Sequence, residues 1–315
     1  MPLTLAQYAD YLDKQGATWP APPQIDRPKV KPHLVRLPQV RAVTWNLYGT
    51  LLAIGGGDLV FEHPNDFIMN VALDKTVQEF KMWASMSRKP GQPADYMKVI
   101  YDQALDGQRL AQPGERFPEI VADRVWESII KKLFQKDYKF DANFYGSLNE
   151  YSRKVAFFFH ASLQGTCCYP GAAAALSHVA GAGLAQGFLA DGQSFTDVQL
   201  RRGLAAQEPA VDLDEAVPAD LRALSHEIRG RKPSDRLFRH SLQQLAKRGV
   251  SPDQVLHVGS RVTQDIIPAR RLGMKTALFA GDRASLQATA EQLKEGPGRP
   301  DVLLSELDQI AEVVP

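Results

Sequence analysis

Polar side chains of the kinds used in catalysis gather in four short stretches of the sequence. They lie at residues 46–50, 190–192, 231–233 and 259–265, each directly after an apolar run or at the start of a helical pattern. A carboxylate at such a turn can attack phosphorus or an sp3 carbon, while a hydroxyl and a lysine hold the charged group. The first stretch, "NLYGTLL", begins with Asn46 where that chemistry needs a carboxylate. Whether a chain that lacks this nucleophile is still an enzyme is therefore the first question.

The elements around these stretches predict an α/β fold. Apolar runs predict buried strands at 40–45, 184–190, 254–259, 275–280 and 301–304. Helical spacing predicts helices at 171–181, from about 195, at 233–249 and at 263–273. Strands that alternate with helices favour a mostly parallel, doubly wound sheet, which binds its ligand beyond the carboxyl ends of the strands. We expect the four stretches to meet there.

About a hundred residues of helical periodicity separate the first strand from the second. Between about Phe61 and Leu163 we expect helices at 65–86, 94–110, 118–135 and 147–163, with loops at "SRKPGQP", "AQPGERFP" and "KDYKFDANF". Before the first strand, a helix at 4–15 precedes the proline-rich "TWPAPPQIDRPKVKP". We predict an N-terminal helix and strap (1–38), a core (39–57 and 164–315) and a helical cap (58–163). The glycines of "AIGGGDL" would form a hinge, and the cap would cover the strand ends that carry Asn46, Lys232 and Asp265.

Taken in order, the four stretches resemble the motifs of the haloacid dehalogenase (HAD) superfamily over about residues 40–285. "NLYGTLL" is similar to its first motif, in which an aspartate nucleophile is followed two residues later by an acid or a tyrosine and then by Gly-Thr. "GFLADGQ" lies where the second motif belongs, "RKPSDRLF" matches the third with its lysine, and "LHVGSRVTQDIIPARRLGM" matches the fourth. The resemblance implies a HAD-like doubly wound parallel sheet, a Rossmann-like core, with an inserted helical cap.

The resemblance also implies a role for each position. The catalytic positions would be Asn46 (the nucleophile position), Tyr48, Thr50, Lys232 and Asp265. The substrate-binding positions would be Thr50, Ala190, Asp191, Lys232 and Ser260. Tyr48 and Ser260 are what the metal-independent 2-haloacid dehalogenases have, whereas Asn46 and Ala190 lack the required carboxylate and hydroxyl. Thr50 could equally serve the turn, and Asp265 could be a partner of Lys232 or a helix cap.

Three explanations of Asn46 follow: natural loss of catalysis, an engineered change, or deamidation to aspartate. The separate losses at Ala190 and Ser260 favour natural loss, and the side chain of Leu47 hinders deamidation. Our leading hypothesis is a HAD-like protein with eroded motifs, non-catalytic or very weak, that binds an anionic or phosphorylated small molecule. The alternatives are an active phosphatase or 2-haloacid dehalogenase, and a scaffold acting through its cap. We expect no cofactor, with Mg²⁺ only if the phosphatase alternative holds and Asp265 as its one carboxylate ligand.

The amino-acid composition limits the kinds of partner that the protein is expected to bind. The 37 basic and 36 acidic residues give a net charge of +1 without blocks of like charge, so we expect no nucleic-acid or membrane partner. A second copy or another protein could bind the cap. No run approaches the roughly 18 apolar residues of a membrane helix, and we expect a cytoplasmic protein.

Adjacent Cys167 and Cys168 are expected to be small packing residues. We expect packing or surface roles for His63, His160, His178, His226, His240 and His257.

Overall fold

The chain forms two compact units in a computed structural model that describes residues 1–85, 92–111 and 114–315. The sheet unit comprises Pro22–Asp58, Thr166–Gly192 and Gln199–Pro315. The helical unit comprises Met1–Ala21, Leu59–Gly165 and Gln193–Val198. Residues 1–38, which we expected to form one segment, therefore divide between the two units.

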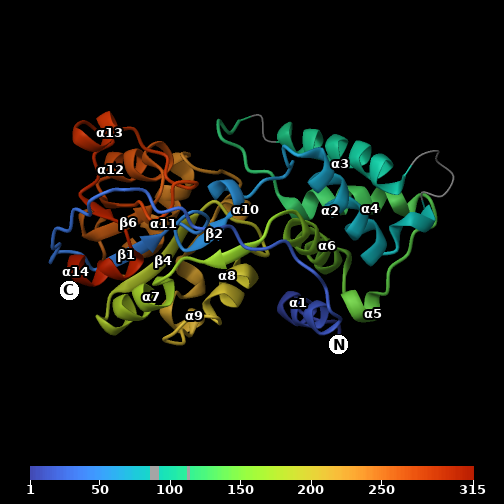
Figure 1. The fold of residues 1–315 in the computed structure, drawn as a ribbon, viewed down its shortest axis with the longest axis horizontal. Helices are drawn as coiled ribbons and strands as arrows, with labels where there is room; N and C mark the ends of the chain where they lie inside the picture. The colour runs from blue at the N-terminus through green and yellow to red at the C-terminus, as the bar shows by residue number, and fades with distance from the viewer. Residues whose placement is uncertain (86–91, 112–113) are drawn as a thin grey trace. The chain divides into compact units, whose positions relative to one another are not determined.

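The sheet unit is built on six parallel strands in the order β5-β4-β1-β6-β7-β8 (Figure 1). The strands are β1 (Ala42–Trp45), β4 (Ala185–Ala190), β5 (Arg222–Leu224), β6 (Val255–Gly259), β7 (Lys275–Phe279) and β8 (Val302–Leu304). The strand order reverses beside β1, which lies between β4 and β6. This confirms the doubly wound parallel sheet. It also places the expected ligand position at the ends of these three strands.

Helices cover both faces of this sheet. The helices of the unit are α7 (Ala172–Gly181), α9 (Leu213–Ala216), α10 (Ser225–Ile228), α11 (Asp235–Ala246), α12 (Ile267–Arg271), α13 (Ala290–Lys294) and α14 (Ile310–Val313). Leu189 of β4 packs in one core cluster with Phe238 of α11 and Ala269 of α12. Gln186, three residues earlier and so on the opposite face, donates to the Leu176 carbonyl of α7 (2.9 Å).

Three short strands of the sheet unit were not predicted. Strands β2 (Leu52–Ile54) and β3 (Thr166–Cys168) pair antiparallel, which joins the turn after β1 to the chain before α7. Strand β5 was missed because it has three residues and follows a polar segment. The proline-rich strap runs along the sheet edge, where His33 and Leu303 exchange two backbone hydrogen bonds of 2.9 Å. This pairing occupies the backbone groups of β8 that a second chain could otherwise bind.

The described residues of the helical unit form helices and no strand, as the periodicity predicts. They are α1 (Leu5–Lys14), α2 (Asp66–Glu79), α3 (Pro93–Arg109), α4 (Ala122–Phe134), α5 (Ala142–Tyr145) and α6 (Leu148–Leu163); helix α8 (Thr196–Leu204) begins in this unit. Ser147 caps α6 and forms a capping box with Glu150. The core gathers around the aromatic rings of Tyr101, Trp126 and Phe159. Most of the loop expected at "SRKPGQP", and part of that at "AQPGERFP", lie outside the described residues.

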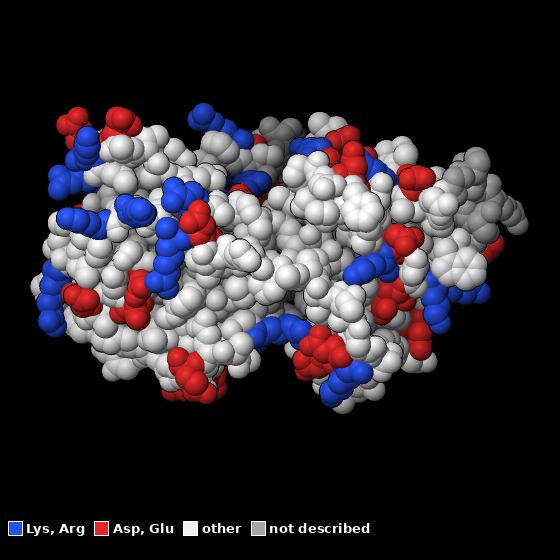
Figure 2. Space-filling model, viewed as in Figure 1, with Lys and Arg blue, Asp and Glu red and all other residues white. Residues whose placement is uncertain are grey.

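Charged side chains of both signs are interspersed on the face shown in Figure 2, in keeping with the net charge of +1. Within the described parts of the chain, no helix is long and apolar enough to cross a membrane.

Candidate functional site

The turn after β1 depends on a glycine. The Asn46 N–H donates to the Val258 carbonyl (2.8 Å), so the β1–β6 pairing continues to the first residue of the turn. Gly49 then takes φ +82°, and a Cβ there would lie 2.9 Å from the Ser260 hydroxyl oxygen. A larger residue would therefore be strained and would also collide with the segment after β6. The glycine of "NLYGTLL" is explained by this geometry whether or not the site is catalytic.

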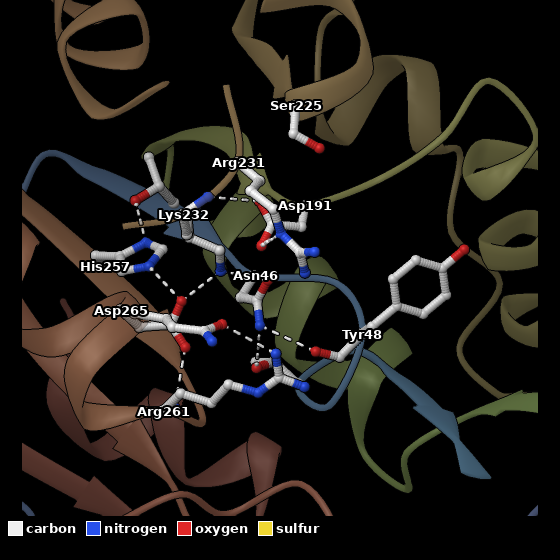
Figure 3. A network of polar contacts seen from close by, with 12 residues as sticks. Asn46, Tyr48, Asp191, Ser225, Arg231, Lys232, His257, Arg261 and Asp265 are labelled. Atoms are coloured by element: carbon white, nitrogen blue, oxygen red, sulfur yellow. Dashed lines mark hydrogen bonds and ion pairs between the residues drawn. The ribbon is translucent and has the colours of Figure 1, made fainter. Parts of the chain in front are cut away.

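The side chain of Asn46 is buried and held at both ends of its amide (Figure 3). Its Nδ2 donates to the Tyr48 carbonyl (3.0 Å) and to Thr50 Oγ1 (3.4 Å), while its Oδ1 accepts from Lys232 Nζ (2.7 Å). These contacts fix which end of the amide faces the lysine. Since Nδ2 has two hydrogens, both are engaged, and the group facing the lysine is a neutral oxygen.

Lys232 and Asp265 form a buried ion pair at the centre of the site (Figure 3). Lys232 Nζ donates to Asp265 Oδ1, and the Arg261 N–H donates to Asp265 Oδ2 (2.9 Å). Burial tends to raise the pKa of Asp265, but Lys232 and His257 outweigh it and hold that pKa below its ordinary value. Asp265 is therefore ionised across the neutral range and balances the buried ammonium.

Local backbone structure brings Asp265 under the end of β6. The chain after Arg261 winds as a π-helical turn over Val262–Ile266, so Asp265 folds back toward the strand. A Cβ on Gly259 would lie only 2.3 Å from the Asp265 Cγ, so the approach requires glycine at this strand end. The helix predicted from 263 accordingly begins as this turn and continues as α12.

Lys232 precedes its helix, as expected, but the helix begins two residues later than the predicted start at Pro233. Helix α11 begins at Asp235, and Ser234 is its N-cap, accepting a hydrogen bond from the Arg236 N–H (3.3 Å). Pro233 therefore precedes the cap instead of occupying the first helical position. The Lys232 backbone is held by Asp191, whose Oδ1 accepts from its N–H (2.8 Å).

His257 belongs to this network, although the sequence indicated only a packing role. Its Nε2 lies 3.6 Å from Asp265 Oδ1, and its Nδ1 lies 3.0 Å from Thr44 Oγ1. Burial lowers the pKa of His257, against the raising effect of Asp265, so the ring is neutral near pH 7. Its position inside β6 could have indicated burial, but the contact with Asp265 depends on the π-helical turn.

The end of β4 supplies Ala190 and Asp191. Ala190 is buried and carries no hydroxyl, whereas Asp191 Oδ2 lies 3.9 Å from Arg231 Nε. Burial raises the pKa of Asp191 against the opposing effects of Lys232 and Arg231. Ser225, at the end of the unpredicted strand β5, bonds to Gly192 and braces this turn through the Gly192 N–H (3.0 Å). Arg231 lies in one of the four stretches that the sequence indicated but was given no role there, and Ser225 was not singled out from the sequence.

Tyr48 contributes its backbone to the site and directs its ring elsewhere. Its hydroxyl donates to Gln199 Oε1 (2.6 Å), and Figure 3 shows the ring extending away from Asn46. The structure therefore brings Asn46, Thr50, Lys232 and Asp265 into direct contact, but it does not bring the Tyr48 hydroxyl to them. The general-acid position is not filled by the phenol in this arrangement.

Ser260 and Arg261, directly after β6, differ in how their side chains are engaged. The Ser260 hydroxyl is buried, and among the described atoms it has no hydrogen-bond partner. The buried Arg261 guanidinium donates to Asp58 Oδ2 (2.8 Å), Gln264 Oε1 (3.0 Å) and the Gly57 carbonyl. Arg261 was missed in the sequence because no pattern links it to the glycine segment 200 residues earlier. It anchors the end of that segment to β6.

The donor set does not suit Mg²⁺. Lys232 Nζ lies between the Asn46 and Asp265 oxygens, and the second Asp265 oxygen accepts from the Arg261 backbone. Ser260 adds no charge, and hard divalent cations in proteins are usually held by carboxylates. In the described part of the chain, no group of three or more His, Cys, Asp or Glu side chains could hold a metal ion.

Comparisons with known proteins agree with this architecture. Residues 230–310 match the model of a family described as HAD-hydrolase-like. The solved 2-haloacid dehalogenase from Pseudomonas syringae pv. tomato DC3000 is similar in fold, with a TM-score of 0.53 and 17% sequence identity over 87% of this chain and 97% of that one. No curated protein sequence matches the chain.

Two further solved structures are also similar to the chain. One is a HAD phosphatase from Thermococcus onnurineus, with 18% sequence identity and a TM-score of 0.43 over 86% of this chain and 96% of that one. The other is the L-2-haloacid dehalogenase from Xanthobacter autotrophicus, with 19% sequence identity and a TM-score of 0.41 over 86% of this chain and 97% of that one. Fold and site together define a HAD-like α/β protein. Its C-terminal part resembles the HAD-hydrolase-like family in sequence, and the resemblance to HAD-like proteins is confirmed.

Proposed function

We propose that this HAD-like protein binds a small anionic molecule at the Asn46–Lys232 site and hydrolyses it very slowly or not at all. One observation carries the proposal: the position that needs an attacking carboxylate holds an amide whose hydrogens and oxygen are all engaged. An amide oxygen bonded to an ammonium group is a poor nucleophile, and the Asp265 and Asp191 carboxylates are engaged with the Lys232 ammonium group and the Lys232 backbone N–H.

The charge balance of the site supports anion binding. An aspartate at position 46 would place a second negative charge on Lys232, whereas Asn46 leaves Lys232 balanced by Asp265 alone. Lys232 has three N–H donors, and Asn46 and Asp265 accept two of them. The third can bind an anion. Arg231, on the other side of Asp191, adds a second positive charge to the same strand ends.

Within this proposal the side chains act by binding and orientation. Lys232 supplies charge, Thr50 helps hold the Asn46 amide, and Asp265 keeps the ammonium group in place. Asp191 fixes the backbone beside Lys232 and so positions that side chain. The Ser260 hydroxyl is a buried donor without a partner among the described residues, and it offers a further contact to a ligand at the end of β6.

The test combines turnover and binding. We expect the native chain to hydrolyse p-nitrophenyl phosphate and chloroacetate at background rates, with and without Mg²⁺, and to bind inorganic phosphate or chloroacetate in titration calorimetry. Lys232→Gln should abolish that binding, and Asn46→Asp should weaken it by about tenfold or more because of the added negative charge. The exposed control Arg124→Gln should bind as the native chain does.

Two outcomes would overturn the proposal. Turnover well above background by the native chain would show a working hydrolase with a nucleophile other than residue 46. Equal binding by the native and Lys232→Gln chains would place the anion elsewhere. Circular dichroism and thermal melting of each variant separate loss of the site from loss of the fold.

A further inference from the structure

A second group of cationic side chains lines a groove on the sheet unit, outside the site just described. The groove has a volume of about 640 Å³ and is lined by Glu227, Ile228, Arg236, Arg239, His240 and Gln243. Its walls are α10 and α11. This volume falls within the range of roughly 300–1,000 Å³ that is usual for small-molecule sites.

One wall is a regular stripe on α11. Arg236, Arg239, His240 and Gln243 follow the spacing i, i+3, i+4 and i+7, which places them on one face of the helix. The stripe consists of hydrogen-bonding side chains, while buried Leu237 and Phe238 of the same helix pack into the core. The polar face therefore fronts the groove along two helical turns.

The two arginines of the stripe are available to a ligand. Arg236 has no side-chain hydrogen bond or ion pair among the described residues, and its side chain is exposed. Arg239 has only a distant pairing with Asp235, at 3.9 Å. The residues that line the groove include the two arginines and one acidic residue, Glu227, so the lining carries a net positive charge.

The opposite wall has a different character. Ile228 presents an apolar side chain, and Glu227 presents a carboxylate that can accept hydrogen bonds from hydroxyl groups. A ligand that satisfies both walls needs an anionic group for the arginines and a hydroxylated organic part for α10. Guanidinium groups favour phosphate in particular, because their planar donors can bind two of its oxygens together.

We propose that this groove is a binding site for a hydroxylated organic phosphate, with the phosphate on Arg236 and Arg239 and the organic part against Ile228 and Glu227. The site is independent of the anion proposed at Lys232. It requires neither a metal nor a chemical step.

The test uses adenosine 5′-monophosphate and glucose 6-phosphate as probes, with adenosine and glucose as the matched compounds without phosphate. In titration calorimetry the native chain should bind at least one phosphorylated probe and neither unphosphorylated compound. Arg236→Gln/Arg239→Gln should weaken that binding at least tenfold. The double variant Arg236→Lys/Arg239→Lys should retain part of the binding, because lysine keeps the positive charge but lacks the planar donors of arginine. Arg36→Gln/Arg124→Gln removes two exposed arginines elsewhere and should change nothing.

The variant Asn46→Asp distinguishes binding in the groove from binding at the Asn46–Lys232 site. It adds negative charge beside Lys232 and should leave binding in the groove unchanged. Equal affinity of the native and Arg236→Gln/Arg239→Gln chains would overturn the inference, as would the absence of binding by the native chain at millimolar probe. Binding that is lost in Asn46→Asp and retained in the arginine variant would assign the probe to the first site instead.

Discussion

Lys232 is the residue on which the candidate site depends, because its ammonium group is buried and contacts both Asn46 and Asp265. A buried charge is tolerated only when it is paired and its hydrogen bonds are satisfied. Asp265 provides the counter-charge, and Asn46 provides a second acceptor without adding charge. The substitution of an amide at position 46 is therefore compatible with a folded site, even though it removes the nucleophile.

Restoring the nucleophile alone should not restore phosphatase activity. In Asn46→Asp, Ala190 still lacks a hydroxyl, Ser260 still lacks a carboxylate, and the Tyr48 hydroxyl is bonded to Gln199. If each missing polar contact is worth about 2.7–4 kcal/mol, two such defects reduce the rate by roughly 10⁴-fold or more.

We therefore expect p-nitrophenyl phosphate turnover by Asn46→Asp to stay at background, with or without Mg²⁺. Robust phosphate hydrolysis by Asn46→Asp would show that residue 46 is an isolated change in a competent site.

Replacing only one partner of the buried Lys232–Asp265 pair should lower the free energy of unfolding more than replacing both partners by apolar residues. Asp265→Asn leaves the Lys232 ammonium without its counter-charge, and we expect a loss of about 3–5 kcal/mol in the free energy of unfolding. Lys232→Met/Asp265→Leu should lose less than either single variant. Urea denaturation followed by circular dichroism measures each value.

The matched control is Asp220→Asn, which removes an exposed partner of Arg248 at 2.9 Å. That change should cost under about 1 kcal/mol, as for other exposed pairs. If Asp265→Asn and Asp220→Asn proved equally mild, Lys232 would have found another partner and the pair would not organise the site.

At the scale of elements, the end of β6 positions the second half of the site. We expect Gly259→Ala to displace Asp265, because the new methyl would overlap the carboxyl group of Asp265 at 2.3 Å. The loss should be of the order of 1–3 kcal/mol, as in other overpacked interiors. Gly181→Ala, in the same unit at the end of α7 with nothing within 4 Å, should be neutral or slightly stabilising. Comparable thermal melts of the two variants would contradict this account of Gly259.

The longer elements could be predicted from the sequence because their patterns are strong. The apolar runs of β1, β4, β6 and β7 mark the strands, and the residues after them mark the edge where ligands bind in this fold. Strands β2, β3 and β5 have three residues each, too few for an alternation to be recognised, whereas the equally short β8 was predicted from its apolar run. The resemblance identified Asn46, Lys232 and Asp265, whereas His257 and Arg261 join them only through tertiary contacts. Tyr48 shows the reverse case, since its position fits a motif but its ring points away.

The whole molecule contains two units, and we expect them to differ in sensitivity to acid. His160 is buried in the helical unit between the rings of Phe61 and Phe195, and its two ring nitrogens have no hydrogen-bond partner among the described atoms. Burial lowers the pKa of His160 to about 3. Between pH 6.5 and 3 the unfolded chain therefore binds a proton that the folded chain does not, and stability falls as the pH falls.

The expected loss from this residue is about 2 kcal/mol at pH 5, and it is absent above pH 6.5. Three of the four tryptophans, Trp19, Trp83 and Trp126, lie in the helical unit and Trp45 lies in the sheet unit, so tryptophan fluorescence during urea unfolding at several pH values reports mainly on the helical unit. His160→Phe should flatten the pH dependence between 6.5 and 5. His33→Gln, an exposed position in the sheet unit, is the control, and an unchanged profile in His160→Phe would assign the acid sensitivity to other groups.

The division of the chain has a practical consequence for dissecting it. The backbone passes from one unit to the other after residues 21, 58, 165, 192 and 198, so each unit is assembled from three separated stretches. No single cut of the gene yields either unit whole. A fragment from Leu59 to Gly165 would lack α1, whose Tyr8 and Leu12 are buried in the core of that unit. A deletion of the same stretch would leave Gln193–Val198 without the residues it packs against. An isolated fragment of this protein would therefore not contain a complete unit, and functions are better assigned by point substitutions in the full chain.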